Sequence, residues 1–168
     1  MTRFVVIFLL VLVCLFTLEM QTGVQREVIE PFTAVLASIS AAIIQPFDDS
    51  VLSYGKVLQF TPGGFAVSIE AGCNGVEASI VLIAAILAYP ASWRARGAAI
   101  AVGLLAVQLM NILRIISLFY LGNWNLDVFT WVHLYLWPAL IMLDVLVVFI
   151  VFLHYLSRQP GASRHAAA

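Results

Sequence analysis

Two long apolar runs in the C-terminal half limit the possible folds more than any other feature of the sequence. Residues 97–122 and 128–156 contain very few polar side chains. The hydrocarbon core of a bilayer is about 30 Å thick, and a helix of roughly 20 apolar residues crosses it. Only helices and closed barrels satisfy all their own backbone hydrogen bonds in lipid. We therefore expect each run to form a membrane-spanning helix.

The composition extends this conclusion to the whole chain. Of 168 residues, 63% are hydrophobic and 10% are charged, whereas soluble domains carry about 25% charged residues. The net charge of −1 gives no reason to expect nucleic acid as a partner. The sequence therefore predicts one all-α, polytopic membrane domain over residues 1–168, with the lipid bilayer as its surroundings.

Two further apolar runs bring the expected number of spans to about four. The first, with its flanks, predicts a membrane anchor over residues 1–22. A cleaved signal peptide is the alternative, but no small-residue cleavage site follows the run, so we expect the anchor to be retained. The other run predicts a second span at residues 78–93, which Pro90 ends.

The segment between these two spans is predicted to lie outside the bilayer core. Residues 31–46 are apolar but short and rich in Ala and Ser, which favours a helix at the membrane interface. Residues 51–70 alternate with a period of two around a Thr-Pro-Gly-Gly turn at 61–64. This pattern is typical of a β-hairpin, here with strands at 57–60 and 65–69.

Basic residues divide unevenly between the two sides of a four-span fold. The positive-inside rule then predicts a cell-membrane protein with both termini in the cytoplasm and the hairpin on the extracytoplasmic side. A fifth span at residues 32–44 would destroy this division, which argues against one. The inner group is Arg3, Arg94, Arg96, Arg158 and Arg164, and the outer group is Arg26 and Lys56.

A lone cysteine between glycines marks the point where the hairpin ends and the second span begins. In Ala-Gly-Cys-Asn-Gly-Val-Glu-Ala at 71–78, Asn74 is a good N-cap and Glu77 follows three residues later, a variant of the capping box. Cys73 is then just outside a helix N-terminus, where the dipole stabilises a thiolate. The alternative is an ordinary small buried cysteine, which is our interpretation of Cys14.

The topology places two more polar residues near Cys73 on the outer side. His133 lies near the outer start of the fourth span, and Arg114 lies roughly 12 Å below the outer end of the third. A thiol can attack a carbonyl, an imidazole can transfer protons and a guanidinium can stabilise an oxyanion. His133 could instead belong to an aromatic belt, and Arg114 could form an ion pair with Glu77.

The third span also carries a polar stripe, because Gln108, Asn111 and Arg114 recur every three residues. We expect this stripe to face inward, away from lipid. Asp144 in the fourth span reaches about the depth of Gln108, so we expect these two side chains to be hydrogen-bonded.

Metal and cofactor ligands are sparse. The chain has two cysteines and three histidines, with neither a CxxC nor an HExxH pattern. His133 and His154 lie near opposite ends of one predicted span and cannot ligate the same haem. We expect no metal and no cofactor.

Three segments together resemble the exosortase/archaeosortase family. They are Cys-Asn-Gly-Val-Glu-Ala at 73–78, Asn-Ile-Leu-Arg-Ile at 111–115, and His133 before an apolar run. The resemblance covers roughly residues 65–156 and is nearest to the short type called exosortase H. Val76 stands where isoleucine is common in the family, a conservative difference.

This resemblance implies a membrane-embedded cysteine protease or transpeptidase that forms a thioester intermediate. Its substrates would be exported proteins with a C-terminal motif, a transmembrane helix and a basic tail. Cys73 would be the nucleophile, His133 the acid–base and Arg114 the oxyanion-side group. The residues alone leave another class open, a non-enzymatic membrane scaffold or a small transporter subunit, in which Cys73 is dispensable. Supporting positions would be Asn74, Glu77 and Asn111.

Overall fold

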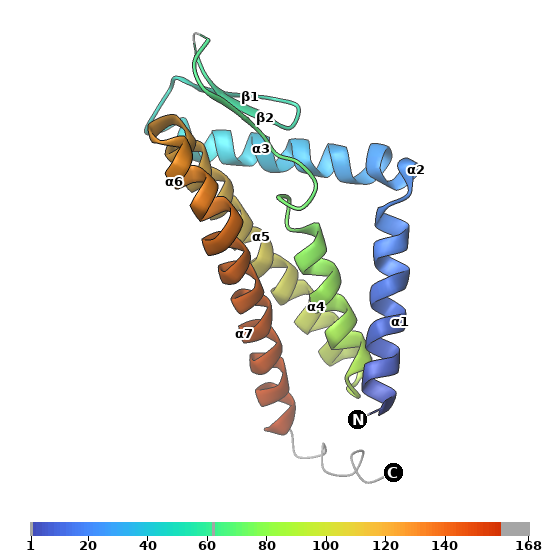
Figure 1. Cartoon of the computed structure of the whole chain (residues 1–168). Coiled ribbons are helices and arrows are strands. Elements are labelled where there is room, and N and C mark those ends of the chain that lie inside the picture. Colours follow the sequence, from blue (N-terminus) through green and yellow to red (C-terminus); the bar gives the residue numbers. More distant parts are fainter. Residues whose placement is uncertain (1, 62, 159–168) are drawn as a thin grey trace.

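The fold is mostly helical, with a small sheet at one end (Figure 1). The computed structural model describes residues 2–61 and 63–158; the predicted turn residue Pro62 and the tail residues Arg164 and His165 lie outside this range. Within it are four long apolar helices and a three-stranded antiparallel sheet. The fold class predicted from the sequence is therefore confirmed.

Three of the four predicted spans coincide with helices that are long and apolar enough to cross a membrane, whereas residues 22–44 replace the predicted span at 78–93. Four helices meet these criteria among the residues described. They are Thr2–Glu19, Thr22–Ile44, Trp93–Trp124 and Leu126–Ser157. The first is α1 and the third is α5. The second joins α2 (Thr22–Val24), a π-helical turn η1 (Gln25–Ile29) and α3 (Glu30–Ile44). The fourth joins α6 (Leu126–Trp131), a second π-helical turn η2 (Val132–Leu136) and α7 (Trp137–Ser157).

The second predicted span, 78–93, is shorter than expected. Helix α4 covers only Val76–Ala88, about 20 Å at the α-helical rise, against a hydrocarbon core of about 30 Å. The helix stops because Pro90 has no N–H to continue it. The Ser92 hydroxyl accepts the N–H of Ala95 at 3.3 Å and caps α5. Trp93, predicted to end the second span, therefore begins the next helix.

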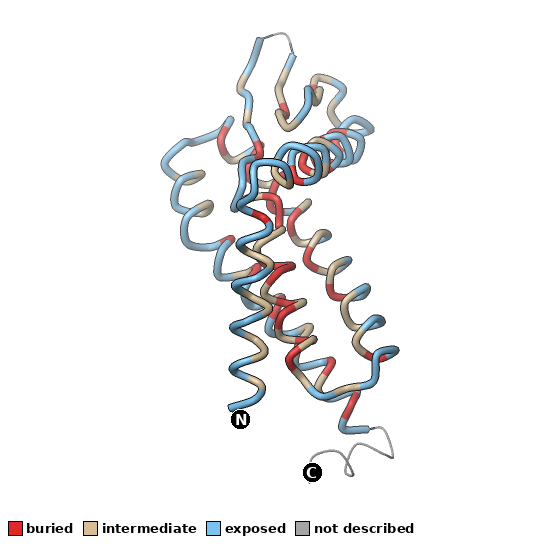
Figure 2. Tube along the Cα trace, turned by 90° about the vertical axis from the view of Figure 1, so that its right-hand side faces the viewer, coloured by how far each residue is buried: buried red, intermediate tan, exposed pale blue. Residues whose placement is uncertain are grey.

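Helix α4 is the centre of the helical bundle. It packs against α1, α5 and α7, and α5 also packs against α7. Their shared apolar core includes Leu82, Ile86, Val107, Ile141 and Val145. Figure 2 shows the buried residues along the facing sides of these helices, while α1 is largely exposed. The outward faces are therefore available to lipid.

Helix α3 runs crosswise to α1, beside the sheet (Figure 1). Its Leu36, Ala37 and Ala41 form a second core with Leu58 of the sheet and Phe119 of α5. The helix 22–44 is long enough to cross a membrane, but its crosswise course is what an interfacial helix requires. The interfacial position predicted for residues 31–46 stays a prediction.

The sheet contains the predicted hairpin and one further strand. Strands β2 (Val57–Phe60) and β3 (Ala66–Ser68) pair antiparallel, and β1 (Val51–Tyr54) pairs with the other side of β2. The order is β1-β2-β3. The tight turn between β1 and β2 uses Gly55 at φ +53°. The sequence pattern does not predict β1, because its four residues show no clear polar–apolar alternation.

The start of α4 differs from the prediction. Its N-cap is Gly75, in the left-handed region at φ +76°, and not Asn74. The Asn74 side-chain oxygen instead accepts the N–H of Val76 at 3.1 Å. The Glu77 carboxylate reaches back to the N–H of Gly72 at 2.5 Å. Both polar side chains therefore close the 72–75 loop, with bonds shifted from those of a capping box.

We predict that Gly75→Ala destabilises the protein by about 1–2 kcal/mol, because a non-glycine residue is strained in the left-handed region. A Cβ there would also lie 3.0 Å from Nε2 of Gln108. Thermal unfolding in detergent measures the effect. Gly97→Ala is the matched control, since a Cβ at Gly97 meets no atom within 4 Å; there we expect a gain of about 0.5–1 kcal/mol. Equal melting temperatures for the two variants would contradict the prediction.

Candidate active site

Three separate elements bring Cys73, Arg114 and His133 together. Cys73 lies in the loop before α4, Arg114 on α5 and His133 in the turn η2. The Cys73 sulfur is 3.9 Å from Nε2 of His133 and accepts a hydrogen bond from Nη2 of Arg114 at 3.4 Å. The three residues that the sequence analysis singled out as nucleophile, acid–base and oxyanion-side group are therefore direct neighbours.

These side chains line a cavity of about 160 Å³. The end of the sheet forms one wall, through β3 and the two residues that follow it. Apolar residues of α5 and α6 form another wall. The complete lining is Val67, Ser68, Ile69, Glu70, Cys73, Arg114, Ile115, Leu118, Phe129 and His133. A thiol, an imidazole and a guanidinium thus share one small space beside an otherwise mostly apolar wall.

Arg114 is a buried cation with no acidic partner in the described structure. Its side chain is 6% exposed. Nη1 donates to the carbonyl of Gly72 at 3.2 Å and Nη2 to the Cys73 sulfur. The only salt bridge among the described residues joins Lys56 and Glu70, so the alternative Arg114–Glu77 ion pair is not formed. The guanidinium holds the cysteine loop and faces the sulfur.

His133 is oriented by a helical irregularity and by an aromatic neighbour. It lies in η2, a π-helical turn, a feature frequent at functional sites. Its ring stacks on Phe129 with centroids 5.5 Å apart and planes 4° from parallel. Nε2 faces the sulfur, while the buried Nδ1 has no hydrogen-bond partner among the described groups. The ring of His133 is therefore oriented by stacking on Phe129 and not by a hydrogen bond from Nδ1 to a third residue.

The resting state of Cys73 differs from the sequence-based expectation of a stabilised thiolate. Burial raises the pKa of the thiol, the Arg114 guanidinium lowers it, and the carboxylates of Glu77 and Glu70 raise it further. The net shift is upward, because partial burial outweighs the attraction of Arg114. Cys73 therefore rests as a thiol and needs a base to become a nucleophile, which gives His133 a chemical purpose.

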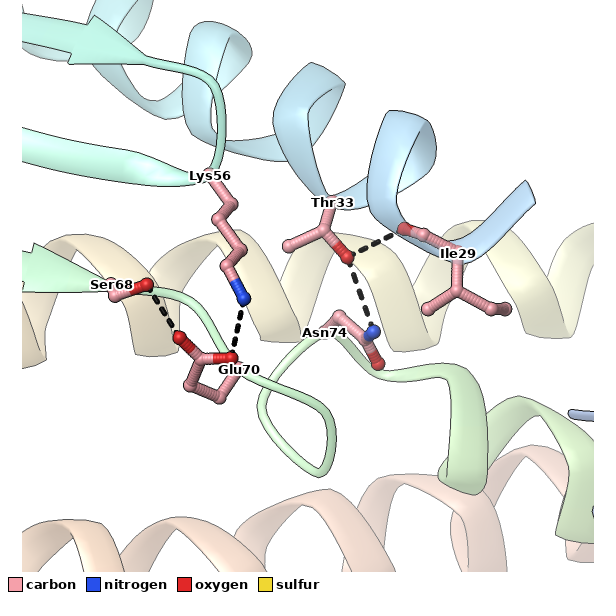
Figure 3. A network of polar contacts seen from close by, with 6 residues as sticks. All are labelled: Ile29, Thr33, Lys56, Ser68, Glu70 and Asn74. Carbon is pink, nitrogen blue, oxygen red and sulfur yellow. Dashed lines mark hydrogen bonds and ion pairs between the residues drawn. The ribbon is translucent and has the colours of Figure 1, made fainter. Parts of the chain in front are cut away.

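Asn74 ties the cysteine loop to α3 through a residue that the sequence analysis missed. The fully buried Asn74 donates from Nδ2 to the hydroxyl of Thr33 at 3.2 Å, and that hydroxyl donates to the carbonyl of Ile29 at 2.8 Å (Figure 3). The only signal in the sequence was a hydroxyl residue in a mostly apolar helix, and Ser40, which is also buried in α3, gives the same signal without a hydrogen bond to the loop.

The rest of the polar stripe on α5 supports the loop from below. A Cβ on Gly75 would lie 3.0 Å from Gln108 and 3.3 Å from Asn111, so both side chains press against this glycine. Asn111 is fully buried and its side-chain amide has no partner among the described groups. The prediction of a Gln108–Asp144 hydrogen bond was wrong. Oε1 of Gln108 and Oδ2 of Asp144 are both buried without a partner among the described groups.

The described residues contain no group of three His, Cys, Asp or Glu side chains placed to hold a metal ion. The polar groups that line the cavity are the Cys73 thiol, the His133 imidazole, the Arg114 guanidinium, the Ser68 hydroxyl and the Glu70 carboxylate.

The fold and this site define a polytopic, mostly helical membrane protein with a cysteine–arginine–histidine cluster. The family described as transmembrane exosortase (Exosortase_EpsH) matches residues 2–153. This match covers most of the chain, which therefore belongs to the transmembrane exosortase family, in general a family of cysteine transpeptidases. No curated protein and no solved structure matches the chain.

We predict that alkylation of Cys73 by iodoacetamide accelerates with pH through a midpoint above the ordinary thiol pKa of about 8.5. The thiolate is the reactive form, and a raised pKa leaves less of it at neutral pH. A Cys14→Ala background leaves Cys73 as the single thiol. Arg114→Gln removes the charge that lowers the pKa and should shift the midpoint upward. A midpoint below the ordinary value would restore the stabilised-thiolate interpretation.

We also predict that Thr33→Val destabilises the protein by about 1–3 kcal/mol, because it leaves the buried Nδ2 of Asn74 without a partner. Thr17→Val is the matched control. The Thr17 hydroxyl makes the same kind of hydrogen bond to the carbonyl four residues earlier, but it is exposed and accepts no bond from a buried side chain. Thermal unfolding of both variants measures the effect. Equal losses of stability in the two variants would show that Thr33 does not support the site.

Proposed function

We propose that this protein is a membrane-embedded cysteine transpeptidase or protease that acts on C-terminal sorting signals of exported proteins. The observation that carries the proposal is the placement of the Cys73 sulfur between Nε2 of His133 and Nη2 of Arg114, in one cavity. Membership of the transmembrane exosortase family supports the same chemistry.

In the first half-reaction, His133 takes the proton of the Cys73 thiol as the sulfur attacks the peptide carbonyl. The separation of 3.9 Å is long for a hydrogen bond, but such contacts commonly tighten only when substrate is bound. A carbon–sulfur bond forms and the carbonyl oxygen becomes an oxyanion. The tetrahedral intermediate then collapses, the carbon–nitrogen bond breaks, and His133 returns its proton to the departing amine. The product is a thioester on Cys73.

In the second half-reaction, an acceptor resolves the thioester. Water, an amine or a hydroxyl group attacks the thioester carbon and gives its proton to His133. The carbon–sulfur bond breaks and the thiolate regains that proton, so the free enzyme is restored. Water makes the reaction a hydrolysis, while an amine or hydroxyl makes it a transfer.

Arg114 stabilises the charge that develops during both steps. Nη2 is directed at the sulfur, next to the carbon that it attacks, so the oxyanion forms within reach of the same planar guanidinium. The bond from Nη1 to the Gly72 carbonyl keeps this group in place before substrate arrives. Donors placed in advance cost no reorganisation in the transition state, which makes them effective catalysts. Asn74, Glu77 and Asn111 then act by holding the loop.

The substrates that fit this arrangement are themselves anchored in the membrane. We propose exported proteins with a C-terminal motif, a transmembrane helix and a basic tail. The site would face the extracytoplasmic side of the cell membrane, with both termini in the cytoplasm. The distribution of arginines in the sequence supports this orientation.

The test is a search for an acyl-enzyme. Protein isolated from its native membranes should carry a peptide on Cys73, visible by mass spectrometry and released by neutral hydroxylamine, which cleaves thioesters. Cys73→Ala should carry none and should leave sorting-signal proteins unprocessed, while Cys14→Ala should behave as wild type. Arg114→Lys should slow processing by roughly 10²–10³-fold, because it keeps the charge but loses the planar donor pair.

Normal processing by Cys73→Ala would rule out cysteine catalysis and favour the scaffold or transporter class, in which this residue is dispensable. If Arg114→Ala only lowers the amount of protein while turnover per molecule is unchanged, Arg114 is structural. The backbone N–H groups after Cys73 would then be the remaining oxyanion donors.

A further inference from the structure

The sheet ends in a free strand edge that borders the candidate active site. Strand β3 is the last in the order β1-β2-β3, so one side of it has no partner strand in the described structure. Val67 and Ser68 of this strand, with the following Ile69 and Glu70, line the cavity that also contains Cys73, Arg114 and His133. The free edge and the nucleophile therefore share one space.

The register of the hairpin decides which backbone groups face this space. The Phe60 N–H donates to the carbonyl of Phe65 at 3.0 Å, and the Ile69 N–H donates to the carbonyl of Lys56 at 2.9 Å. Backbone groups of successive strand residues point to opposite sides. Residues 65, 67 and 69 thus face β2, and the N–H and C=O groups of Ala66 and Ser68 point to the free side. Both of these residues are exposed.

The same edge continues directly to the nucleophile. Glu70 is the next residue in the outward-facing series, and its carbonyl accepts the N–H of Cys73 at 2.9 Å. Its carboxylate is held by the Ser68 hydroxyl at 2.7 Å and by Lys56 at 2.6 Å (Figure 3). The backbone between the open edge and Cys73 is therefore braced by side-chain bonds.

We propose that β3 binds the substrate as an additional strand: an extended peptide segment pairs with the outward N–H and C=O groups of Ala66 and Ser68 and is led to the Cys73 sulfur. Such strand addition draws affinity from main-chain hydrogen bonds and specificity from pockets for alternate side chains. Leu118 and Phe129 in the cavity wall provide an apolar surface for one such side chain.

The opposite edge of the sheet does not have these properties. By the same register, the outward-facing residues of β1 are Val51 and Ser53, and neither lines the cavity. Strand β1 packs against α3. Of the two edges, β3 alone combines open backbone groups with access to a nucleophile. This inference rests on the proposed function, because it describes how the peptide of that reaction is held.

The experiment compares two randomised pools of tetrapeptides, each carrying a C-terminal vinyl sulfone that reacts with thiols. The second pool is N-methylated at every amide, which removes its hydrogen-bond donors. The full chain with Cys14→Ala, in detergent, is labelled at Cys73 and the rate is read by mass spectrometry. We expect the methylated pool to react roughly tenfold more slowly or worse, the effect of losing about two hydrogen bonds.

Two proline variants locate the effect on the sheet. Ala66→Pro removes an outward N–H from β3 without removing a bond to β2 or a side-chain hydrogen bond, so peptide labelling should fall by a similar factor. Ser53→Pro is the matched control, because it removes the equivalent outward N–H from β1; labelling should not change. Iodoacetamide, which needs no strand pairing, should alkylate Cys73 at rates within about twofold in both variants, showing that the site remains intact.

Equal labelling by the two pools, or equal losses in the two proline variants, would overturn strand addition while leaving the proposed reaction standing. Reaction of Cys73 with iodoacetamide but with neither peptide pool would overturn both proposals. Self-crosslinking of a Ser68→Cys variant through β3 would assign the edge to a second copy of the chain, and would likewise overturn peptide binding there.

Discussion

The buried guanidinium of Arg114 is the interaction on which the rest of the site depends. Removing a cation from water is costly unless good partners replace the water, and this one has a backbone carbonyl and a sulfur in place of a carboxylate. Both partners belong to the same short loop, at Gly72 and Cys73. The charge on α5 can therefore be satisfied only when the loop before α4 is correctly placed, and this couples folding of the bundle to assembly of the nucleophile.

The loop is also held from its other sides. Thr33 on the crosswise helix α3 binds Asn74, and Gly75 turns the chain into α4 in a conformation that excludes a side chain. Glu77 reaches back to close the loop at Gly72. A segment of four residues thus has contacts to α3, α4 and α5. Contacts with rigid elements of this kind hold a nucleophile in the orientation that attack on a substrate carbonyl requires.

Sequence patterns accounted for the helical membrane fold, the β2–β3 hairpin and the three polar residues that meet in the cavity. These follow from long-range hydropathy, from turn chemistry and from the order of spans, all of which are visible along the chain. The patterns did not separate Asn74 from Gly75 as the cap, because both residues suit a helix start and the left-handed backbone of Gly75, at φ +76°, is set only in the folded chain. They also overestimated α4, since apolar character continued past the point where Pro90 stops the helix.

Other features depend on contacts between distant segments and leave little trace in a single sequence. The partnership of Thr33 with Asn74 joins residues 41 positions apart. The pKa of Cys73 is raised because the folded protein partly buries the thiol, and this burial outweighs the attraction of the Arg114 guanidinium. A Gln108–Asp144 bond was expected because the two residues lie at similar depth in the membrane. Depth does not fix the direction in which a side chain points around its helix axis, and Gln108 in fact faces the Gly75 turn.

The π-helical turn η2 makes the fourth long helix sensitive to changes in its length. An α-helix rotates roughly 100° per residue, and a π-turn inserts one residue into that progression. His133 lies in this turn, whereas the packing face of α7, with Trp137, Ile141 and Val145, follows it. Removing one residue from 132–136 would restore regular α-helix and turn the two parts out of phase by about that angle. Either the imidazole or the apolar face would then point the wrong way, so this stretch can exchange side chains far more readily than it can gain or lose a residue.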